Sequence, residues 1–299
     1  MEKPTFALDL ETTGLDPHRD GVLEAGLTGA RAYDCLVSDA PPSAPAARAA
    51  HGITPQMARR LGKPGRVVLS ELLDVLGPGP VKLVAHNAAF DRSFLEAWAG
   101  REGLRLPEIA WTCTLTEARE LCPSAAVSRS LGSLAGRFGW HTERLHRARA
   151  DAALALRLHG ALSAWRDIRN RLDGAPRVVY LAGPLRGDGV PRSIHHNRER
   201  MLALAQWVQG VLPEATLVVP HGNFAFLDES GDRGLEVRER ALASCARLLE
   251  RCDALVLCGE LSPGMVHERE VAERCGLPWF AAPGWDPPEW LTFQVPAVA

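Results

Sequence analysis

The sequence predicts two consecutive α/β domains: a mixed sheet with flanking helices, then a second α/β domain with a mainly parallel sheet. The chain has 299 residues, 46% of them hydrophobic, which is enough for two cores. Apolar stretches in the first half read as strands in hairpin order and then as alternating strands and helices, and the second half alternates throughout. A long helical pattern ends at Asp173-Gly174-Ala175-Pro176, where glycine followed by proline signals a helix stop. We therefore expect domains at 1–165 and 177–299 and a linker at 166–176.

The elements follow from the spacing of apolar residues. In the first half we expect strands at 4–10, 21–27, 33–38 and 81–85, and helices at about 54–60, 67–76, 88–99, 114–121, 130–138 and 148–165. In the second half we expect a strand at 177–182, a helix at about 194–210, a strand at 216–220, a turn at 221–223, a helix at 236–251, a strand within 252–260 and a final helix after 262.

Four acidic residues of the first half are placed to converge. Asp9 and Glu11 end an apolar strand, and strand side chains two residues apart point to the same face. Asp91 and Asp151 each lie at or near the start of an amphipathic helix. A carboxylate cluster without cysteine or imidazole ligands favours Mg²⁺ or Mn²⁺ over Zn²⁺. Two such ions can activate water and stabilise the leaving oxygen of a phosphodiester, so the sequence predicts a two-ion site.

His146 precedes Asp151 by five residues. The ordinary pKa of histidine lets it take a proton near neutral pH, so His146 is the candidate general base. Taken singly, each of these five side chains could be a surface or helix-cap residue. The prediction depends on their order and context in one chain.

The segments DLETTG, HGIT, AHNAAFD and HRARAD follow one another, and together they resemble the DnaQ-like 3′–5′ exonuclease family, DEDDh branch, over roughly residues 4–163. The resemblance implies a ribonuclease H-like architecture for the mixed sheet. It implies that the four carboxylates hold two metal ions and that His146 is the base. It also implies that single-stranded DNA or RNA is shortened from its 3′ end to nucleoside 5′-monophosphates. Relatives often carry an Asp-Thr pair where this chain has Cys113-Thr114, a position that is not a metal ligand in the family.

Smaller motif residues are candidates for substrate contacts. Thr12, Thr13 and Gly14 follow the carboxylate strand, where amides and hydroxyls can meet a terminal nucleotide, although an ordinary Thr-Gly turn is the alternative. His86 and Asn87 lie between a strand and the Asp91 helix. Asn87 either caps that helix or, as the resemblance implies, helps to shape the nucleotide pocket with His86.

The net charge and its distribution limit the kinds of molecule that the chain can bind. The net charge is −2, which argues against holding long duplex by charge alone. Residues 1–165 carry 19 basic and 18 acidic side chains, whereas 176–299 carry 12 and 16, so nucleic acid is expected at the first half. Five arginines crowd around His146 in sequence, where a phosphate backbone could lie, or where they form a solvated helical face: Arg129, Arg137, Arg144, Arg147 and Arg149.

The seven cysteines contain no Cys-x-x-Cys pair and are odd in number, which indicates reduced thiols. The N-terminus shows no signal-peptide pattern, and no stretch is long enough to span a membrane. We therefore expect a cytoplasmic protein without a membrane partner.

The second half carries its own motifs. VVYLAGPLRG predicts a buried strand entering a turn with Gly183, whose backbone amides can meet phosphate or sugar. After the strand CDALVLCGE, SPGMVHEREVAERCG places Ser262 and Gly264 in a turn and Glu268 one turn into the next helix. Parallel strands of this kind put a ligand site at their carboxyl ends.

YLAGPLRG, CDALVL and SPGMVHE together resemble the nucleoside 2-deoxyribosyltransferase-like superfamily over about residues 177–282. The resemblance implies that Glu268 is the nucleophile on the sugar anomeric carbon, a role that suits a carboxylate because the transition state is oxocarbenium-like. Alternatively, Glu268 is a helix-start carboxylate in a domain that only binds a nucleoside or nucleotide. Asp228 or Asp232 could supply a second acid.

The expected function is a metal-dependent 3′–5′ exonuclease fused to a nucleoside- or nucleotide-handling domain. One alternative is a nucleoside deoxyribosyltransferase or N-glycosidase with an accessory exonuclease domain. The other is a non-catalytic sensor of nucleic acid or nucleotides, which would have no need of the complete five-residue set. The sequence leaves open DNA against RNA, the pathway and a polymerase partner.

Overall fold

The computed structural model of the chain describes residues 3–123, 128–140, 146–172, 177–185, 191–223 and 234–283. The chain forms two compact units that interleave along the sequence. Unit 1 comprises Met1–Glu120, Arg129–Ser133 and Thr142–Leu162, and unit 2 comprises Leu121–Ser128, Leu134–His141 and Ser163–Ala299.

Unit 1 is built on a five-stranded mixed sheet in the order β3-β2-β1-β4-β5. β1 pairs antiparallel with β2, and β2 pairs antiparallel with β3, whereas β1–β4 and β4–β5 are parallel. This arrangement confirms the predicted mixed sheet. The strands are β1 (Thr5–Thr12), β2 (Val22–Gly29), β3 (Tyr33–Leu36), β4 (Val81–Ala85) and β5 (Ile109–Cys113).

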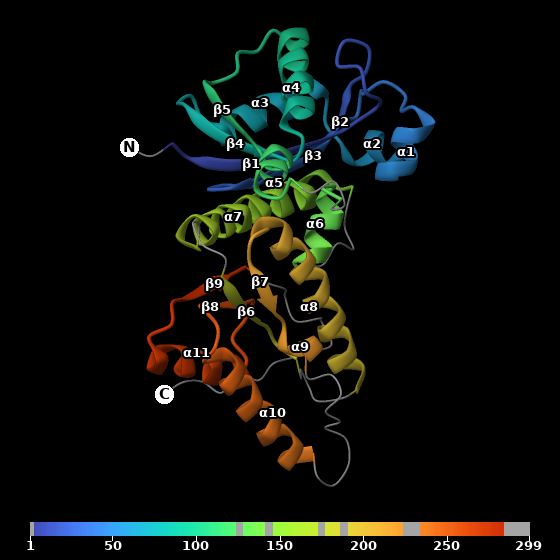
Figure 1. Cartoon of the computed structure of the whole chain (residues 1–299). Coiled ribbons are helices and arrows are strands. Elements are labelled where there is room, and N and C mark those ends of the chain that lie inside the picture. The colour runs from blue at the N-terminus through green and yellow to red at the C-terminus, as the bar shows by residue number, and fades with distance from the viewer. Residues whose placement is uncertain are drawn as a thin grey trace, which may run out of the picture. The chain divides into compact units, whose positions relative to one another are not determined.

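The helices of the first half of the chain are α1 (Pro45–His51), α2 (Pro55–Leu61), α3 (Gly65–Leu76), α4 (Ala88–Glu102), α5 (Thr114–Leu121), α6 (Leu131–Arg137) and α7 (Ala148–Leu172). α3 and α4 cover one face of the sheet, and α7 lies against the other (Figure 1).

Side chains alternate along β1, so one face of the strand packs into the core and the other face looks toward α7. Phe6, Leu8 and Leu10 are buried in the core beneath α3 and α4. The alternate residue Ala7 packs against Ala152 of α7. Because side chains alternate along a strand, the positions that follow Ala7 on the same face point toward the side of α7. Those positions are the two carboxylates predicted to bind metal.

Unit 2 contains a four-stranded sheet in the order β7-β6-β8-β9, in which every pairing is parallel. The predicted second, mainly parallel sheet is therefore confirmed. Its strands are β6 (Val178–Ala182), β7 (Thr216–Val218), β8 (Ala254–Cys258) and β9 (Trp279–Ala282). Its helices are α8 (Pro191–Val211), α9 (Pro220–Asn223), α10 (Gly234–Leu249) and α11 (Pro263–Cys275).

A segment from the first half of the sequence completes the core of unit 2. Phe138 stacks on Trp140, with ring centroids 4.8 Å apart, and meets the edge of Trp207 of α8 at 5.8 Å. All three rings are buried. The apolar pattern at 130–138 thus belongs largely to a core formed by residues that come much later in the chain.

Several local predictions were wrong. Three elements were not expected: α1, β5 and β9. The predicted turn at 221–223 lies in the short helix α9, and Gly264 lies in the first turn of α11 instead of in the turn before it. Residues 166–172 of the predicted linker continue α7, while 173–176 lie outside the described residues. The domain boundaries themselves stay a prediction.

In the part of the chain that the structure describes, none of the helices combines the length and apolar character needed to cross a membrane. All seven cysteines lie in the described part of the chain and form no disulfide there, and their reduced state stays a prediction.

Candidate metal centre

The structure brings the four predicted carboxylates and His146 to one place at the end of β1. Asp9 and Glu11 occupy the face of β1 that looks toward α7. Asp151 lies in the first turn of α7 and Asp91 in the first turn of α4. The charges of Asp91, Glu11 and Asp151 all act on Asp9, so the four groups form one electrostatic cluster.

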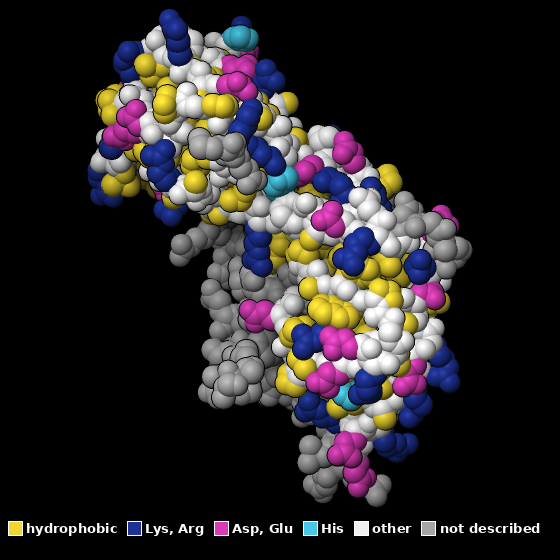
Figure 2. Space-filling model, turned by 90° about the vertical axis from the view of Figure 1, so that its left-hand side faces the viewer, with side chains coloured by type: hydrophobic (Ala, Val, Ile, Leu, Met, Phe, Trp, Pro, Cys, Tyr) yellow, Lys and Arg dark blue, Asp and Glu magenta, His cyan; other side chains and the backbone are white. Residues whose placement is uncertain are grey.

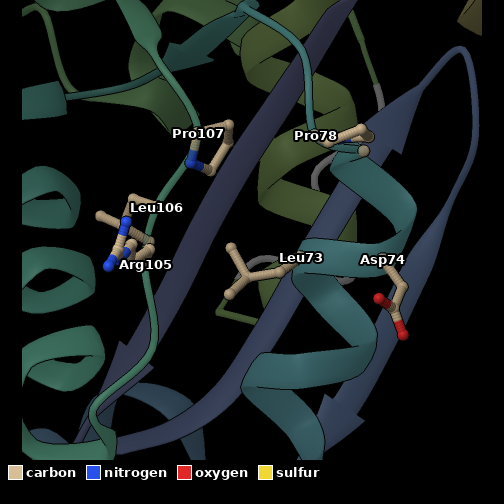
Figure 3. Close-up of a pocket in the computed structure, with 7 residues that line it drawn as sticks. Leu73, Asp74, Pro78, Arg105, Leu106 and Pro107 are labelled. Carbon is tan, nitrogen blue, oxygen red and sulfur yellow. The ribbon is translucent and has the colours of Figure 1, made fainter.

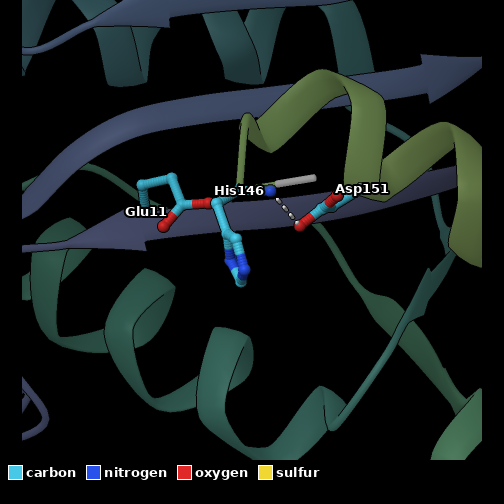
Figure 4. A group of neighbouring side chains, drawn as sticks. All are labelled: Glu11, His146 and Asp151. Atoms are coloured by element: carbon cyan, nitrogen blue, oxygen red, sulfur yellow. Dashed lines mark hydrogen bonds between the residues drawn. The ribbon is translucent and has the colours of Figure 1, made fainter. Parts of the chain in front are cut away.

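Glu11, His146 and Asp151 form the tightest part of this cluster. One ligand atom from each lies within 4.8 Å of the others, and Figure 4 shows His146 between Glu11 of β1 and Asp151 of α7. The backbone N–H of His146 donates to Asp151 Oδ2 at 3.1 Å. Asp151 Oδ1 is buried and has no hydrogen-bond partner among the described residues. A buried carboxylate oxygen of this kind calls for a hydrogen-bond donor or a cation as its partner.

Asp91 links α4 to β1, the strand that carries Asp9 and Glu11. Its side chain is only 2% exposed, and its Oδ1 accepts the backbone N–H of Leu10 at 3.1 Å. Burial raises the pKa of Asp91 well above its ordinary value, although the Leu10 hydrogen bond opposes the rise. The bond fixes Asp91 beside the strand positions of Asp9 and Glu11.

Burial and mutual repulsion raise the pKa values of the clustered carboxyl groups. Burial, then the charges of Asp91 and Glu11, raise the pKa of Asp9 well above its usual range. Burial, with Asp151 and Glu24 nearby, raises the pKa of Glu11 to about 7. Burial also raises the pKa of Asp151. Oxygen ligands that repel one another in this way fit divalent cations of the Mg²⁺ or Mn²⁺ type, whose charge would offset the repulsion.

Sequence reasoning missed a fifth carboxylate beside the cluster, the buried Glu24 of β2. Glu24 is 1% exposed and stands directly opposite Glu11 in the β1–β2 register. It accepts the guanidinium of Arg147, with Nη2 at 2.6 Å, and the N–H of Ala148 at 3.0 Å. A glutamate within the apolar stretch VLEAGL was the available signal. Its partner 123 residues away could not be read from the sequence.

The predicted substrate residues after β1 form a braced turn. Thr13 is fully buried, and its Oγ1 accepts the N–H of Gly21 at 2.9 Å. Thr12 donates its hydroxyl to the carbonyl of Gly14 at 2.6 Å. A Cβ on Gly14 would lie 2.3 Å from the carboxylate of Asp20, so a larger residue here would displace that side chain. The contact of this turn with a nucleotide stays a prediction.

His86 and Asn87 connect β4 to α4. His86 Nδ1 lies 2.9 Å from Thr114 Oγ1 at the start of α5. Burial lowers the pKa of His86, which favours the neutral ring. Asn87 has a left-handed backbone, with φ 69°, and its side chain makes no capping bond to α4. Asn87 is therefore the N-cap residue of α4 without a side-chain capping bond, and its place in a nucleotide pocket stays a prediction.

Cys113, where relatives often carry aspartate, lies at the end of β5. Burial raises the pKa of its thiol, but hydrogen bonds from Thr116 and from the backbone of Ala88 and Leu115 outweigh this and lower the pKa overall. The side chain therefore occupies an anion-favouring position between the starts of α4 and α5.

His51, of the segment HGIT, ends α1 and is buried. Its Nδ1 accepts the N–H of Ile53 at 2.9 Å, which places the ring proton on Nε2. Burial lowers the pKa of His51, and the charge of Glu24 opposes that change. Nε2 has no partner among the described residues.

The structure describes four of the five arginines of the predicted cluster. Arg147 is engaged by Glu24, and Arg137 belongs to unit 2, where it donates to the carbonyl of Ala203 at 3.4 Å. Arg144 lies outside the described residues. On the face drawn in Figure 2, basic and acidic side chains are interspersed over the described residues, without a large basic patch. Phosphate contacts by these arginines stay a prediction.

In unit 2, the clearest polar feature is a buried pair. Tyr180 of β6 donates its hydroxyl to Glu268 Oε1 of α11 at 2.7 Å. Burial raises the pKa of Glu268 to about 7, and the Tyr180 bond opposes the rise. Ser262 is the N-cap of α11, and its Oγ accepts the N–H of Met265. Gly183 is buried just beyond the end of β6.

A ligand role for Gly183, Ser262, Gly264 and Glu268 stays a prediction. Asp228 and Asp232, the two candidates for a second acid, lie outside the described residues.

A shallow pocket of about 400 Å³ lies elsewhere in unit 1 (Figure 3). It is lined by the end of α3, with Leu73 and Asp74, and by the segment before β5, with Arg105 and Leu106. It opens where the parallel strands β4 and β5 begin, whereas Asp91 and the metal cluster lie where β1 and β4 end. The pocket is therefore separate from the metal centre.

Comparisons with known proteins give a family match for the first half of the chain. A sequence profile of the RNase_T family, described as Exonuclease, matches residues 6–159. The chain is 33% identical over 159 residues to the DNA polymerase III PolC-type of Thermotoga petrophila, covering 51% of this chain and 11% of that polymerase. It is 31% identical over 179 residues to the DNA polymerase III PolC-type of Listeria monocytogenes, covering 57% and 12%. The chain thus spans about a tenth of the length of these relatives.

Among solved structures, the chain is similar to the zinc-bound complex of E. coli exonuclease I with single-stranded DNA, at 18% identity and a TM-score of 0.47 over 57% of this chain and 45% of that chain. The complex of E. coli exonuclease I with a dT13 oligonucleotide also gives a TM-score of 0.47. The assignment rests on the sequence profile, which covers just over half of the chain and contains the whole metal centre. The chain belongs to the exonuclease family.

Proposed function

We propose that unit 1 is a 3′–5′ exonuclease that hydrolyses single-stranded DNA or RNA to nucleoside 5′-monophosphates with two Mg²⁺ or Mn²⁺ ions. The observation that carries this proposal is the convergence of four carboxylates with raised pKa values, one of which has an unpartnered buried oxygen. Asp9, Glu11, Asp91 and Asp151 are the proposed ligands. When bound, the ions would lower the pKa of water and stabilise the leaving oxygen.

His146 is the proposed general base. It takes the proton of the water that attacks the terminal phosphorus, while the bond from phosphorus to the 3′ oxygen of the preceding nucleotide breaks. Its backbone N–H is bonded to Asp151, so the base and a metal ligand hold one another in place. The ring itself is exposed, where a substrate can reach it. Thr12, Thr13, Gly14, His86 and Asn87 are the proposed contacts of the terminal nucleotide.

The test uses DNA and RNA oligonucleotides labelled at either end, incubated with Mg²⁺, Mn²⁺ or EDTA. We expect a ladder of 5′-labelled products that shortens stepwise, immediate release of a 3′ label as mononucleotide, and no reaction in EDTA. Asp9→Asn should abolish the reaction, whereas Asp74→Asn, the same change at an exposed position of α3, should leave it intact. Full activity in EDTA or in Asp9→Asn would contradict the proposal.

We further propose that unit 2 binds a nucleoside or nucleoside monophosphate. The Tyr180–Glu268 pair supports this, because a buried carboxyl group with a pKa of about 7 is typical of sites that use it chemically. Glu268 would then act as nucleophile on the anomeric carbon or, without turnover, contact a sugar hydroxyl.

The decisive measurement is calorimetry of the full chain, with Asp9→Asn silencing the nuclease, against deoxynucleosides and their monophosphates. Assays for released base follow in this background with Glu268→Ala and, as a control, the exposed neighbour Glu270→Ala. Binding that only Glu268→Ala weakens would support the proposal, and base release would assign catalysis. No binding of any of these compounds would contradict it.

A further inference from the structure

The metal centre is flanked by an ion pair that the proposed chemistry does not use. Glu24 is buried directly opposite Glu11, and like charges in directly opposite strand positions destabilise a sheet. A carboxylate is retained there only with a strong partner, and Arg147 supplies it. Its Nη2 lies 2.6 Å from Oε1, and its Nε lies 3.1 Å from both oxygens. The guanidinium thus makes two-pronged hydrogen bonds to the carboxylate, which fix the relative orientation of the two side chains as well as their distance.

Glu24 also binds the helix that carries the site. Its Oε2 accepts the N–H of Ala148, the first residue of α7, so the carboxylate satisfies a free amide at the positive end of the helix. Gly26 follows Glu24 by two positions on β2. A Cβ on Gly26 would lie 2.1 Å from the backbone nitrogen of Arg149. The start of α7 therefore docks directly onto β2, with Glu24 and Arg147 fixing its register.

His146 is the residue immediately before this anchor. Its φ is 66°, a left-handed conformation that residues with a Cβ rarely adopt. The backbone of His146 is held on one side by Arg147, through Glu24, and on the other by its own N–H bond to Asp151. An unusual backbone conformation persists where the surroundings determine it from both sides.

We infer that Glu24 and Arg147 are positioning residues that hold His146 in the conformation from which it acts on the attacking water. This inference rests on the proposed role of His146 as base. Neither residue is among the proposed metal ligands, and neither is the proposed base. Lysine could not replace Arg147 fully, because an ammonium group cannot reproduce the fork to both oxygens of Glu24.

The test is a double-mutant comparison under saturating Mg²⁺ and single-stranded substrate. Glu24→Gln and Arg147→Lys should each lower kcat by about 10- to 100-fold, with KM little changed, because small displacements of a catalytic group have effects of that size. In the His146→Ala background, the same changes should have almost no further effect on kcat. Glu71→Gln, which breaks the Lys63–Glu71 pair between α3 and the segment after β3, is the control and should leave kcat unchanged.

The outcomes separate the two proposals. If His146→Ala keeps full turnover, the proposed base is wrong. If His146→Ala is slow but Glu24→Gln and Arg147→Lys match the wild type, only the positioning inference fails. It also fails if their effects multiply with that of His146→Ala, since the pair then acts on another part of the site. Should Glu24→Gln unfold, Arg147→Lys decides alone, because this half-exposed side chain tolerates the change without emptying the core.

Discussion

Glu11→Gln should make the metal-free protein more stable at neutral pH while destroying its metal site. Burial, followed by the charges of Asp151 and Glu24, raises the pKa of Glu11 from its ordinary 4.5 to about 7. Between these two values the folded state keeps a proton that the unfolded chain has lost. Stability is therefore highest below pH 4.5 and declines as the pH rises through 7. At 1.36 kcal/mol per pKa unit, the full loss is about 3 kcal/mol, and glutamine, which does not ionise, avoids it.

The measurement is thermal unfolding of the wild type and Glu11→Gln in EDTA at pH 4.5 and pH 8. For a unit of this size, about 3 kcal/mol corresponds to a Tm difference of roughly 6–12 °C in favour of the variant at pH 8. At pH 4.5 the two should nearly coincide. With Mg²⁺ at pH 8 the difference should shrink or reverse, because the wild type gains binding energy that the variant lacks.

The matched control is Glu71→Gln, since hydrogen bonds from Lys63 and Tyr33 lower the pKa of Glu71. That variant should gain no stability at pH 8. A Glu11→Gln protein that melts at or below the wild type in EDTA at pH 8 would refute the inference that burial and repulsion strain the empty cluster.

Four further predictions concern single residues. His146→Ala should lower turnover by roughly two to four orders of magnitude, with affinity for single strands unchanged in fluorescence anisotropy; lost affinity with normal turnover would make His146 a phosphate contact. Gly26→Ala, whose methyl group would meet the backbone of α7, should lower the free energy of unfolding by about 1–3 kcal/mol and slow turnover. Gly100→Ala, in open space on α4, should raise the free energy of unfolding by about 1 kcal/mol in urea titrations. Tyr180→Phe should raise the pKa of Glu268 above about 7 in an NMR titration, because the Tyr180 bond holds it down; an unchanged pKa would mean that the bond is weak.

The convergence of Asp9, Glu11, Asp91 and Asp151 could be predicted because each depends on a local rule. Alternation along β1 sets the first two, and a helix start sets each of the others. Glu24 could not be assigned in the same way. A single glutamate in a strand pattern predicts a residue on the solvent-exposed face. Its actual buried position depends on an ion pair with an arginine more than a hundred residues away.

The elements that escaped prediction share a physical reason. β5 and β9 are edge strands of only five and four residues with partly exposed side chains, so the apolar pattern of each is too short to distinguish a strand from a loop. α1 is a short alanine-rich helix whose pattern is weak in either period. Apolar periodicity did find the helical pattern at 130–138, but periodicity does not state which core a helix joins.

The interleaving of the two units has a consequence for how the protein is made. A ribosome releases Phe138 and Trp140 well before Trp207 exists, yet the three rings share one buried contact. The nascent first half can assemble its sheet and the proposed metal ligands, but the ring contact of Phe138 with Trp207 has to wait until α8 emerges. A chain cut at the predicted boundary after residue 165 would lack this contact. We expect fragments that end before α8 to aggregate through this aromatic surface, and co-translational folding to finish only when the second half arrives.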